Sequence, residues 1–236
     1  MASKVHIEAV QNRKELKEVV LFPFRLYRDD PNWVPPLIGE RMQHYDPAHN
    51  PFFQHAEMQV TIAAIADEMH LKVWGEPVGF FGLFECIEDD AVAAALFDAA
   101  RRWLAERGRE VMRGPMNLNI NDECGMLVEG FDGPPVIMMS YNPPYYPPML
   151  EHYGFTKAKD IHAYKVDIAR YGPNLGNIPE KIARVARIAR ERYGVTMRHV
   201  RLDRLAEEVE LIKPIYRQAW SKNWGAIPLP DAEFDY

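Results

Sequence analysis

Several features that mark large classes of protein are scarce in this chain of 236 residues. Its two cysteines, Cys86 and Cys124, stand far apart and outside any Cys-x-x-Cys spacing, which excludes a disulfide framework and a cysteine-rich metal site. No hydrophobic run approaches the roughly 18 residues of a membrane-spanning helix. The first residues, MASKVHIEAVQNRKELK, hold no apolar signal-peptide core. These absences predict a cytoplasmic protein with reduced thiols.

Basic residues are outnumbered, and metal-binding motifs are absent as well. The net charge of −6, from 28 Lys and Arg against 34 Asp and Glu, argues against nucleic acid as the main partner. The 8 histidines follow no His-Glu-x-x-His spacing, so no metal is predicted. Hydrophobic residues make up 47% of the chain, which is enough to bury the core of one large domain or two small ones.

Strand and helix patterns alternate along the chain, which predicts the α/β class. The expected helices cover 13–27, where an apolar stripe continues despite Pro23, and 91–107, which closes at Gly108. In the second helix Leu96, Ala100, Trp103 and Leu104 should face inward. The expected strands cover 5–10, 58–66, 78–84, 111–119 and 162–166.

The stretch from Arg113 to Lys159 gathers the polar groups that a binding crevice needs. After the strand, Asn117, Asn119 and Asn121 fall at alternate positions, so an extended backbone would point their amides to one side. Asp122, Glu123 and Cys124 follow directly. A second apolar run covers 136–140 and stops at Pro143-Pro144; Tyr145 and Tyr146 then begin a short helix that ends at Gly154.

These residue types suit the chemistry of an amine nucleophile. Asp122 or Glu123 could act as the general base, and the Asn amides could hold a carbonyl or a polar head group. Tyr141, Tyr145 or Tyr146 could supply an acid, and Cys124 is a weaker candidate for a nucleophile because no His stands at a recognisable spacing. The structural alternatives are that Asn and Asp satisfy backbone groups in a turn and that the tyrosines pack around prolines.

Several separated phrases of the sequence resemble one family. FRLYRDDPNWVPPL, NPFFQHAE, GFFGLFE, NDECGMLVEGFD and YNPPYYP are similar to the bacterial ceramide synthase-like branch of the GNAT acyltransferase superfamily, and NPPYYPPMLEHYGF resembles the last helix of that fold. The resemblance implies a GNAT-like mixed central sheet flanked by helices. It also implies an N-acyltransferase that uses acyl-CoA or acetyl-CoA as donor and an amine, such as a long-chain sphingoid base, as acceptor.

With the resemblance beside the residue chemistry, we predict two sets of site residues. The catalytic set is Asp122, Glu123 and Tyr146. The substrate-binding set consists of residues from the same stretch, namely Asn117, Asn119, Asn121, Cys124, Asn142 and Tyr145.

Two departures from the family pattern support a competing hypothesis. The glycine-rich loop that cradles a cofactor pyrophosphate is replaced by ECIEDDAVAAAL, whose acids suit a bare helix N-terminus and would repel phosphate; these acids are Glu85, Glu88, Asp89 and Asp90. Leu150 stands where many members carry a tyrosine acid. The alternative is therefore a non-catalytic binding or scaffold module of GNAT-like fold that has lost its CoA site.

The beginning of the chain is echoed near its end. VHIEAVQNRKELKEVV, Pro23, Asn32-Trp33 and Pro36-Leu37 reappear as VTMRHVRLDRLAEEVE, Pro214, Asn223-Trp224 and Pro228-Leu229. We predict a first domain over 1–172, a linker helix over 173–194, and the start of a second GNAT-like repeat over 195–236, with a strand at 195–202 and a helix through Trp220. The repeat stops early, which suggests a fragment, and the family's glycine turn is lacking near Val60 and Thr61, which suggests missing residues.

The expected linker helix is basic and amphipathic. Lys181, Arg184, Arg187 and Arg190 recur every three residues beside Ile182, Val185, Ile188 and Ala189. Such a helix could lie on an anionic membrane or meet cofactor phosphates, and the structural alternative is a solvated linker.

Overall fold

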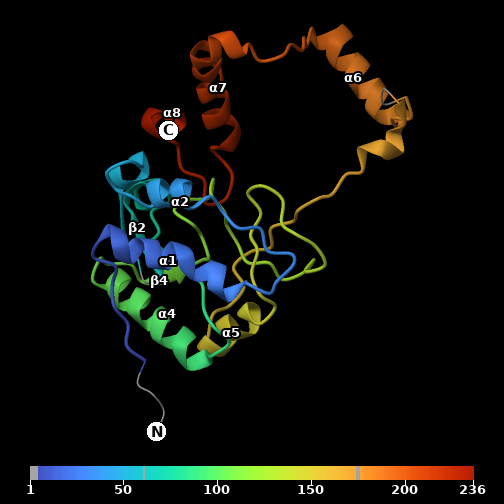
Figure 1. The fold of residues 1–236 in the computed structure, drawn as a ribbon. Helices are drawn as coiled ribbons and strands as arrows, with labels where there is room; N and C mark the ends of the chain where they lie inside the picture. The colour runs from blue at the N-terminus through green and yellow to red at the C-terminus, as the bar shows by residue number, and fades with distance from the viewer. Residues whose placement is uncertain (1–4, 61, 174–175) are drawn as a thin grey trace. The chain divides into compact units, whose positions relative to one another are not determined.

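The computed structural model describes residues 5–60, 62–173 and 176–236, which divide into two units (Figure 1). Unit 1 is formed from the described residues of Met1–Lys159 and Ile215–Tyr236, and unit 2 from those of Asp160–Pro214. None of the helices in the described ranges has the length and apolar character needed to cross a bilayer.

A mixed sheet of four strands forms the centre of unit 1. The strands lie in the order β1-β2-β3-β4 and are β1 Ala56–Gln59, β2 Ala63–Asp67, β3 Val78–Gly82 and β4 Val111–Arg113. The first three are antiparallel neighbours, and β4 runs parallel to β3. Every residue of β2 and β3 is buried, as expected of strands that are covered on both faces. The predicted α/β class is confirmed.

Helices cover the two faces of this sheet because successive strand residues point to opposite sides. Ile65 and Phe80 pack in one hydrophobic cluster with α1 Arg13–Leu26 and α2 Ile38–His44. Phe81 packs in the other with α4 Asp90–Ala105 and α5 Tyr146–Tyr153. The shorter elements of unit 1 are η1 Pro51–Gln54, α3 Glu68–Trp74 and α8 Asp231–Asp235.

The helices and their ends follow the sequence closely. Leu16 and Val20 of α1 are buried, as are Leu96, Ala100 and Leu104 of α4, whereas Trp103 is only partly buried. Gly154 ends α5 in a left-handed conformation with φ of 107°, and the Phe155 amide then donates to the Leu150 carbonyl at 3.0 Å. This is the glycine stop that the sequence predicted.

Two strand predictions near the N-terminus are wrong. The run 58–66 is not one strand but parts of β1 and β2, which pair antiparallel with Gln59 opposite Ala64. Val60 and Ile62, which lie at the turn, are buried apolar residues, so the sequence carries no polar turn signal there. The suggestion of missing residues concerns Val60 and Thr61, and Thr61 lies outside the described residues.

The segment 5–10 forms no strand among the described residues. It is joined to the sheet region through the Val10 amide, which donates to the Val60 carbonyl at 2.8 Å. Val60 lies one residue past the end of β1, so this contact is not part of the strand ladder.

Unit 2 is made of short elements and two longer helices. They are η2 Ile168–Tyr171, α6 Glu180–Tyr193, η4 Leu202–Arg204 and α7 Leu205–Trp220, of which α7 continues into unit 1. The predicted helix through Trp220 is confirmed, and α6 lies where the linker helix was expected.

The strands expected at 162–166 and 195–202 are wrong, since the structure assigns neither segment to a strand. Strand residues need a paired neighbour, and unit 2 contains no other strand in its described part to pair with. Arg198 and Arg201 instead form ion pairs with Glu208 of α7, each with a closest distance of 2.7 Å. The tandem repeat and its boundaries stay a prediction.

The close approach of β3 to the chain after β4 leads to a first testable prediction. A Cβ atom on Gly82 would lie 2.0 Å from the backbone oxygen of Met116, so Gly82→Ala requires the backbone to move. We expect a loss of unfolding free energy of about 1 to 3 kcal/mol, measured by urea denaturation. Gly39→Ala is the control: nothing lies within 4 Å of its Cβ position, and in α2 alanine should be neutral or stabilising. Equal effects at both positions would contradict the tight packing.

Candidate functional site

The polar groups of unit 1 collect where the parallel strands β3 and β4 end. The ladder stops at Phe80 opposite Arg113, after which the Met116 amide still donates to the Phe81 carbonyl at 2.8 Å. Leu83 then adopts a left-handed φ of 48° and its amide donates to the Asn117 side chain at 2.8 Å. The segments that follow β3 and β4 separate beyond this point. Crevices at the carboxyl ends of parallel strands are common binding sites.

Glu85 lies at this end of β3 and was misplaced by the sequence prediction. It was expected among the acids at the start of α4, but its carboxylate accepts hydrogen bonds from the hydroxyls of Tyr27 and Tyr146, both at 2.8 Å. The reason is that Tyr27 of the α1 end and Tyr146 of α5 both reach the segment after β3, where they offer a partly buried carboxylate two donors.

Burial raises the pKa of Glu85 to about 7, from an ordinary value of 4.5. The two tyrosine hydrogen bonds act in the opposite direction, because they stabilise the charged form, and the negative charge of Glu123 adds to the increase. Glu85 keeps partial exposure. A partly accessible carboxyl with a pKa near neutrality suits proton transfer at physiological pH.

The tyrosines of the predicted site hold fixed hydrogen bonds. Tyr146 is 2% exposed, and its hydroxyl also accepts from the Cys86 amide at 2.7 Å. Burial raises the pKa of Tyr146, and the charge of Glu85 raises it further. Tyr145 donates to the Cys86 carbonyl at 2.9 Å, and Tyr141 donates to Asp30 at 2.6 Å. Tyr146 is therefore placed to orient Glu85.

The predicted row of three Asn amides is wrong. Residues 117–124 form a loop that is closed by an isolated bridge between Met116 and Cys124, and Leu118 has a left-handed φ of 77°. The extended geometry is lost, so the amides point to different partners. Asn117 bonds Leu83 and Glu123, whereas the Asn119 side chain accepts from the Asn121 amide at 2.7 Å.

Glu123 is an acid whose charge acts on Glu85, and it is held in place by the positive charge of Arg41. Its carboxylate forms an ion pair with Arg41 of α2 and accepts from the Asn117 side chain at 3.1 Å. Arg41 also donates to the Tyr45 hydroxyl at 3.1 Å. The loop after β4 is thus tied to α2, and the Glu123 charge lies close enough to act on Glu85.

A small pocket brings three of the predicted residues together. It has a volume of about 130 Å³ and is lined by Asn119, Asn121 and Asp122 together with His44, Asn50, Phe52, Leu229, Glu233 and Tyr236. The Asp122 carboxylate lies 3.1 Å from His44 Nε2, and the Asn121 side chain accepts a hydrogen bond from the Tyr216 hydroxyl. Since one water occupies roughly 30 Å³, this space suits a small polar head group.

Asn142 bonds the backbone, and Cys124 packs against the hydrophobic cluster that contains Leu118. The Asn142 amide is 5% exposed and satisfies three main-chain groups, namely the Leu127 amide and the carbonyls of Leu127 and Pro143. Burial raises the pKa of the Cys124 thiol, which lowers its thiolate fraction. Both residues therefore shape the loop, and Cys124 is poorly suited to act as a nucleophile.

A buried ionic cluster, which shares Glu233 with the pocket, was not predicted from the sequence. His55 lies between Asp67, with Nδ1 at 3.0 Å, and Glu233, with Nε2 at 2.7 Å. Burial alone would lower the pKa of His55, but its bonds to Asp67 and Glu233 outweigh it and raise that pKa to about 9. The cluster joins α8 to the β1–β2 hairpin. Its members are 12 and 178 positions from His55, so no local motif could have indicated it.

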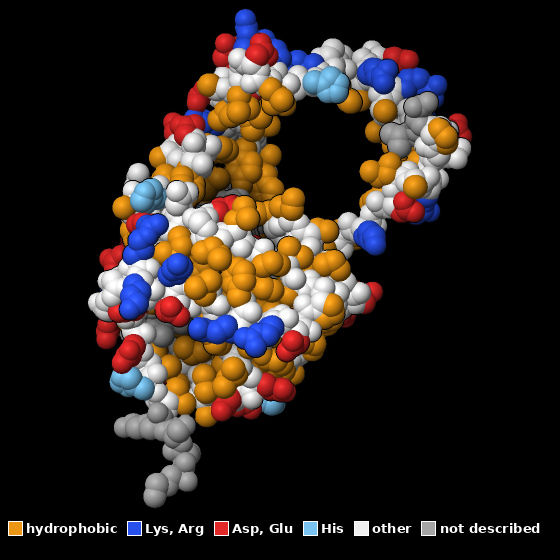
Figure 2. Space-filling view, viewed as in Figure 1, with side chains coloured by type: hydrophobic (Ala, Val, Ile, Leu, Met, Phe, Trp, Pro, Cys, Tyr) orange, Lys and Arg blue, Asp and Glu red, His pale blue; other side chains and the backbone are white. Residues whose placement is uncertain are grey.

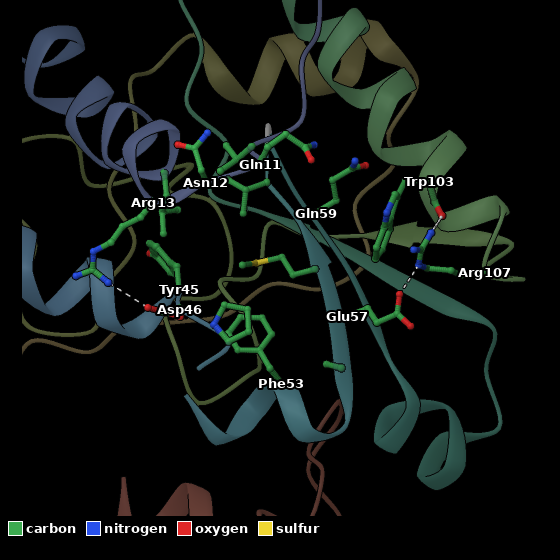
Figure 3. Close-up of a pocket in the computed structure, with 16 residues that line it drawn as sticks. Gln11, Asn12, Arg13, Tyr45, Asp46, Phe53, Glu57, Gln59, Trp103 and Arg107 are labelled. Atoms are coloured by element: carbon green, nitrogen blue, oxygen red, sulfur yellow. Dashed lines mark hydrogen bonds and ion pairs between the residues drawn. The ribbon is translucent and has the colours of Figure 1, made fainter. Parts of the chain in front are cut away.

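A second and larger hollow lies along β1 (Figure 3). The groove has a volume of about 610 Å³ and contains none of the predicted site residues. Trp103 of α4 and Arg107, which follows the end of that helix, face it from one side. Arg107 bonds Glu57 at 2.9 Å, and Arg13 pairs with Asp46 on the other side. Within the described residues no group of three or more His, Cys, Asp or Glu side chains is arranged to hold a metal ion.

The start of α4 is already capped by its own side chain. The Asp89 carboxylate accepts from the amides of Ala91 at 2.8 Å and Val92 at 3.3 Å. With Asp90 in the first turn, this end of the helix has negative charge where a pyrophosphate would need free amides. Leu150 is 8% exposed and packs in the core beside α4, so it offers no acid.

Comparison with known proteins finds two long relatives. The chain is a homologue of "Bacterial ceramide synthase" of Caulobacter vibrioides, with 40% identity over 95% of this chain, and of "Protein YghO" of Escherichia coli, with 36% identity over 94%. It spans 60% and 58% of the lengths of these two relatives. No family model matches the chain. No solved structure matches it either.

The raised pKa of Glu85 predicts how stability depends on pH. A carboxyl whose folded pKa is about 7 and whose ordinary value is 4.5 contributes stability that is complete below pH 4.5 and lost as the pH rises through 7. The loss should be on the order of 3 kcal/mol, since the rise from 4.5 to about 7 corresponds to about 1.4 kcal/mol for each pKa unit. Glu85→Gln should flatten this part of the curve in urea denaturation between about pH 5 and pH 8.

The neighbouring exposed acid is the control for this measurement. Glu88→Gln should leave the slope unchanged. His55 also loses its stabilising contribution as the pH rises through about 9, so the relevant quantity is the difference between each variant and the parent protein. An unchanged slope in Glu85→Gln would contradict a raised pKa at Glu85.

Proposed function

We propose that this chain is part of an N-acyltransferase, an enzyme that transfers an acyl group from a thioester to the amine of a long-chain sphingoid base. The observation that carries the proposal is the identity of 40% with a bacterial ceramide synthase, spread over 95% of this chain. The proposed fold is GNAT-like, with a second repeat beginning near Val195. The mixed sheet with helices on both faces supports it.

The proposed reaction is direct transfer. The amine nitrogen attacks the thioester carbonyl, so a C–N bond forms and the C–S bond breaks; the nitrogen gives up a proton and the thiolate leaves. Glu85 is our first candidate for the group that takes this proton, because its pKa near 7 lets it be ionised at neutral pH and still accept a proton. Tyr27 and Tyr146 fix the carboxylate in position.

The predicted residues take supporting roles in this proposal. Asn119, Asn121 and Asp122 would hold the amine and hydroxyl head group in the small pocket, with Asp122 or Glu123 as the alternative base. Asn117, Cys124 and Asn142 would maintain the loop, and Tyr145 would fix the Cys86 backbone.

The donor is proposed to be acyl-CoA or acetyl-CoA, or another acyl thioester. The acidic start of α4 does not fit a pyrophosphate, so a CoA donor would place its phosphates elsewhere on the protein. This misfit and the buried Leu150 favour the second candidate function, a non-catalytic binding module that retains only the fold.

Substitution of Glu85 tests the chemistry. Glu85→Gln should lower kcat for transfer from palmitoyl-CoA to sphinganine by about 10² to 10⁴ in the intact protein, because the amide cannot take the proton. The same variant should unfold at an equal or higher urea concentration near pH 7. Glu88→Gln should retain activity, and full activity of Glu85→Gln would assign the base elsewhere.

The head-group pocket is tested separately. Asn121→Ala and Asp122→Ala should reduce acyl transfer to sphinganine more than they reduce stability. If the two residues only maintain the turn, each change should cost on the order of 1 kcal/mol of stability and leave the activity of each folded molecule unchanged.

Ligand binding separates the enzyme from the binding module. Acetyl-CoA, palmitoyl-CoA and free CoA should each be compared for the rise in melting temperature that a ligand of the native state must cause. We expect palmitoyl-CoA to give the largest rise. A protein stabilised by sphinganine but by none of the CoA compounds would be the binding module.

A further inference from the structure

Helix α6 presents an apolar face that its own unit does not cover. None of its 14 residues is buried, and Ile182, Val185 and Ile188 are exposed by 54%, 57% and 42%. Gly194 ends the helix in a left-handed conformation, so its length is fixed. In Figure 1, α6 is one of the two longer helices of unit 2, and Figure 2 shows Lys and Arg side chains along the same segment.

The apolar residues of α6 form one stripe. At 3.6 residues per turn, Ile182, Val185, Ala186, Ala189 and Tyr193 fall on one side of the helix. Ile188 lies outside this stripe, beyond Lys181 and Arg192. The stripe runs along the full length of one side of the helix. A linker helix surrounded by water would not need such a stripe.

The charged residues are sorted around this stripe. Lys181 and Arg192 flank it on one side, and Arg190 flanks it on the other. The two acids, Glu180 and Glu191, fall on the opposite face. Long basic side chains beside an apolar stripe can bury their stems and keep their charges at the level of lipid phosphates. The acids are then farthest from the lipid.

The charge of α6 has the opposite sign to that of the chain. Five basic and two acidic residues give the helix a net charge of +3, whereas the whole chain has −6. Across the described part of the chain, no salt bridge joins these five basic residues to a carboxylate. Their charge is therefore available to a partner of negative charge, and the apolar stripe requires that this partner also accept hydrocarbon.

We propose that α6 is an interfacial helix that lies on an anionic lipid bilayer, with the stripe of Ile182, Val185 and Ala189 in the acyl region and with Lys181, Arg190 and Arg192 at the headgroups. Polar-faced helices of this kind bind through buried apolar area and attraction to anionic lipid. An anionic bilayer supplies both negative charge and hydrocarbon at one surface. A hydrated, charged protein surface supplies the charge alone, and the apolar core of a protein supplies the hydrocarbon alone. This inference does not rest on the proposed reaction.

Vesicle flotation with the intact protein tests the proposal. The probes are large vesicles of about one phosphatidylglycerol to three phosphatidylcholine, and vesicles of phosphatidylcholine alone, both at about 0.1 M salt. We expect binding to the anionic vesicles to be at least tenfold tighter and to weaken as salt is raised. No acyl donor is present, so the outcome is independent of catalysis.

Three double variants separate the parts of the helix. Lys181→Gln with Arg190→Gln removes two flanking charges and should weaken binding by at least tenfold, at about fivefold per charge. The matched control, Arg184→Gln with Arg187→Gln, removes two charges from the opposite face and should weaken it less. Ile182→Ser with Val185→Ser removes apolar area and should reduce binding to both kinds of vesicle.

Circular dichroism of each variant verifies that helix content is retained. Absence of binding to anionic vesicles by the folded parent protein would overturn the proposal, as would equal losses in the flanking and control variants. The molar mass from light scattering tests whether the stripe instead contacts another protein chain. If Ile182→Ser with Val185→Ser dissociates an oligomer and leaves vesicle binding unchanged, the stripe contacts protein and the lipid proposal is wrong.

Discussion

The close packing of β3 against the chain that follows β4 is the constraint on which the site depends. Gly82 and Gly114 leave no space for a Cβ: the one at Gly82 would reach the Met116 backbone, and the one at Gly114 would lie 2.3 Å from the Phe81 carbonyl oxygen. Two backbones that approach this closely bring the residues after each strand together. Glu85 and the 117–124 loop are neighbours for that reason, although they lie more than thirty positions apart in the sequence.

The sequence predicted the longer helices well because helix signals are local, whereas it did not predict the short helices α2, α3 and α8. The N-cap at Asn12, the apolar positions of α1 and α4, and the glycine stop at Gly154 are all set by residues within a few turns. Strands need partners from elsewhere, so strand prediction was less successful. The run 58–66 holds two strands whose turn is buried, while 162–166 and 195–202 have a strand-like pattern but no partner strand in the described part of unit 2.

The arrangement of the candidate site was predicted in part, and the roles of its residues stay a prediction. Sequence placed Asn119, Asn121 and Asp122 in one loop, and they do line one pocket. Glu85 was missed because a glutamate shortly before a helix is usually a solvated or capping residue, and its two tyrosine partners are 58 and 61 positions away. The His55 cluster was missed for the same reason. In both cases a buried charge is fixed by tertiary contacts, which no spacing within one segment can show.

The electrostatics of Glu85 favour a functional role over a structural one. A carboxyl with a raised pKa lowers stability at neutral pH, since the folded protein must either keep a proton that the unfolded chain releases or hold a charge in a poorly solvated place. The two tyrosine hydroxyls reduce this cost without removing it. Glutamine in the same place would fill nearly the same volume, bond the hydroxyls and avoid the cost. His55 is the contrasting case, because Asp67 and Glu233 raise its pKa by stabilising its charged form, and that favours the fold. Glu85 is therefore a group whose charge the fold does not need for its own stability.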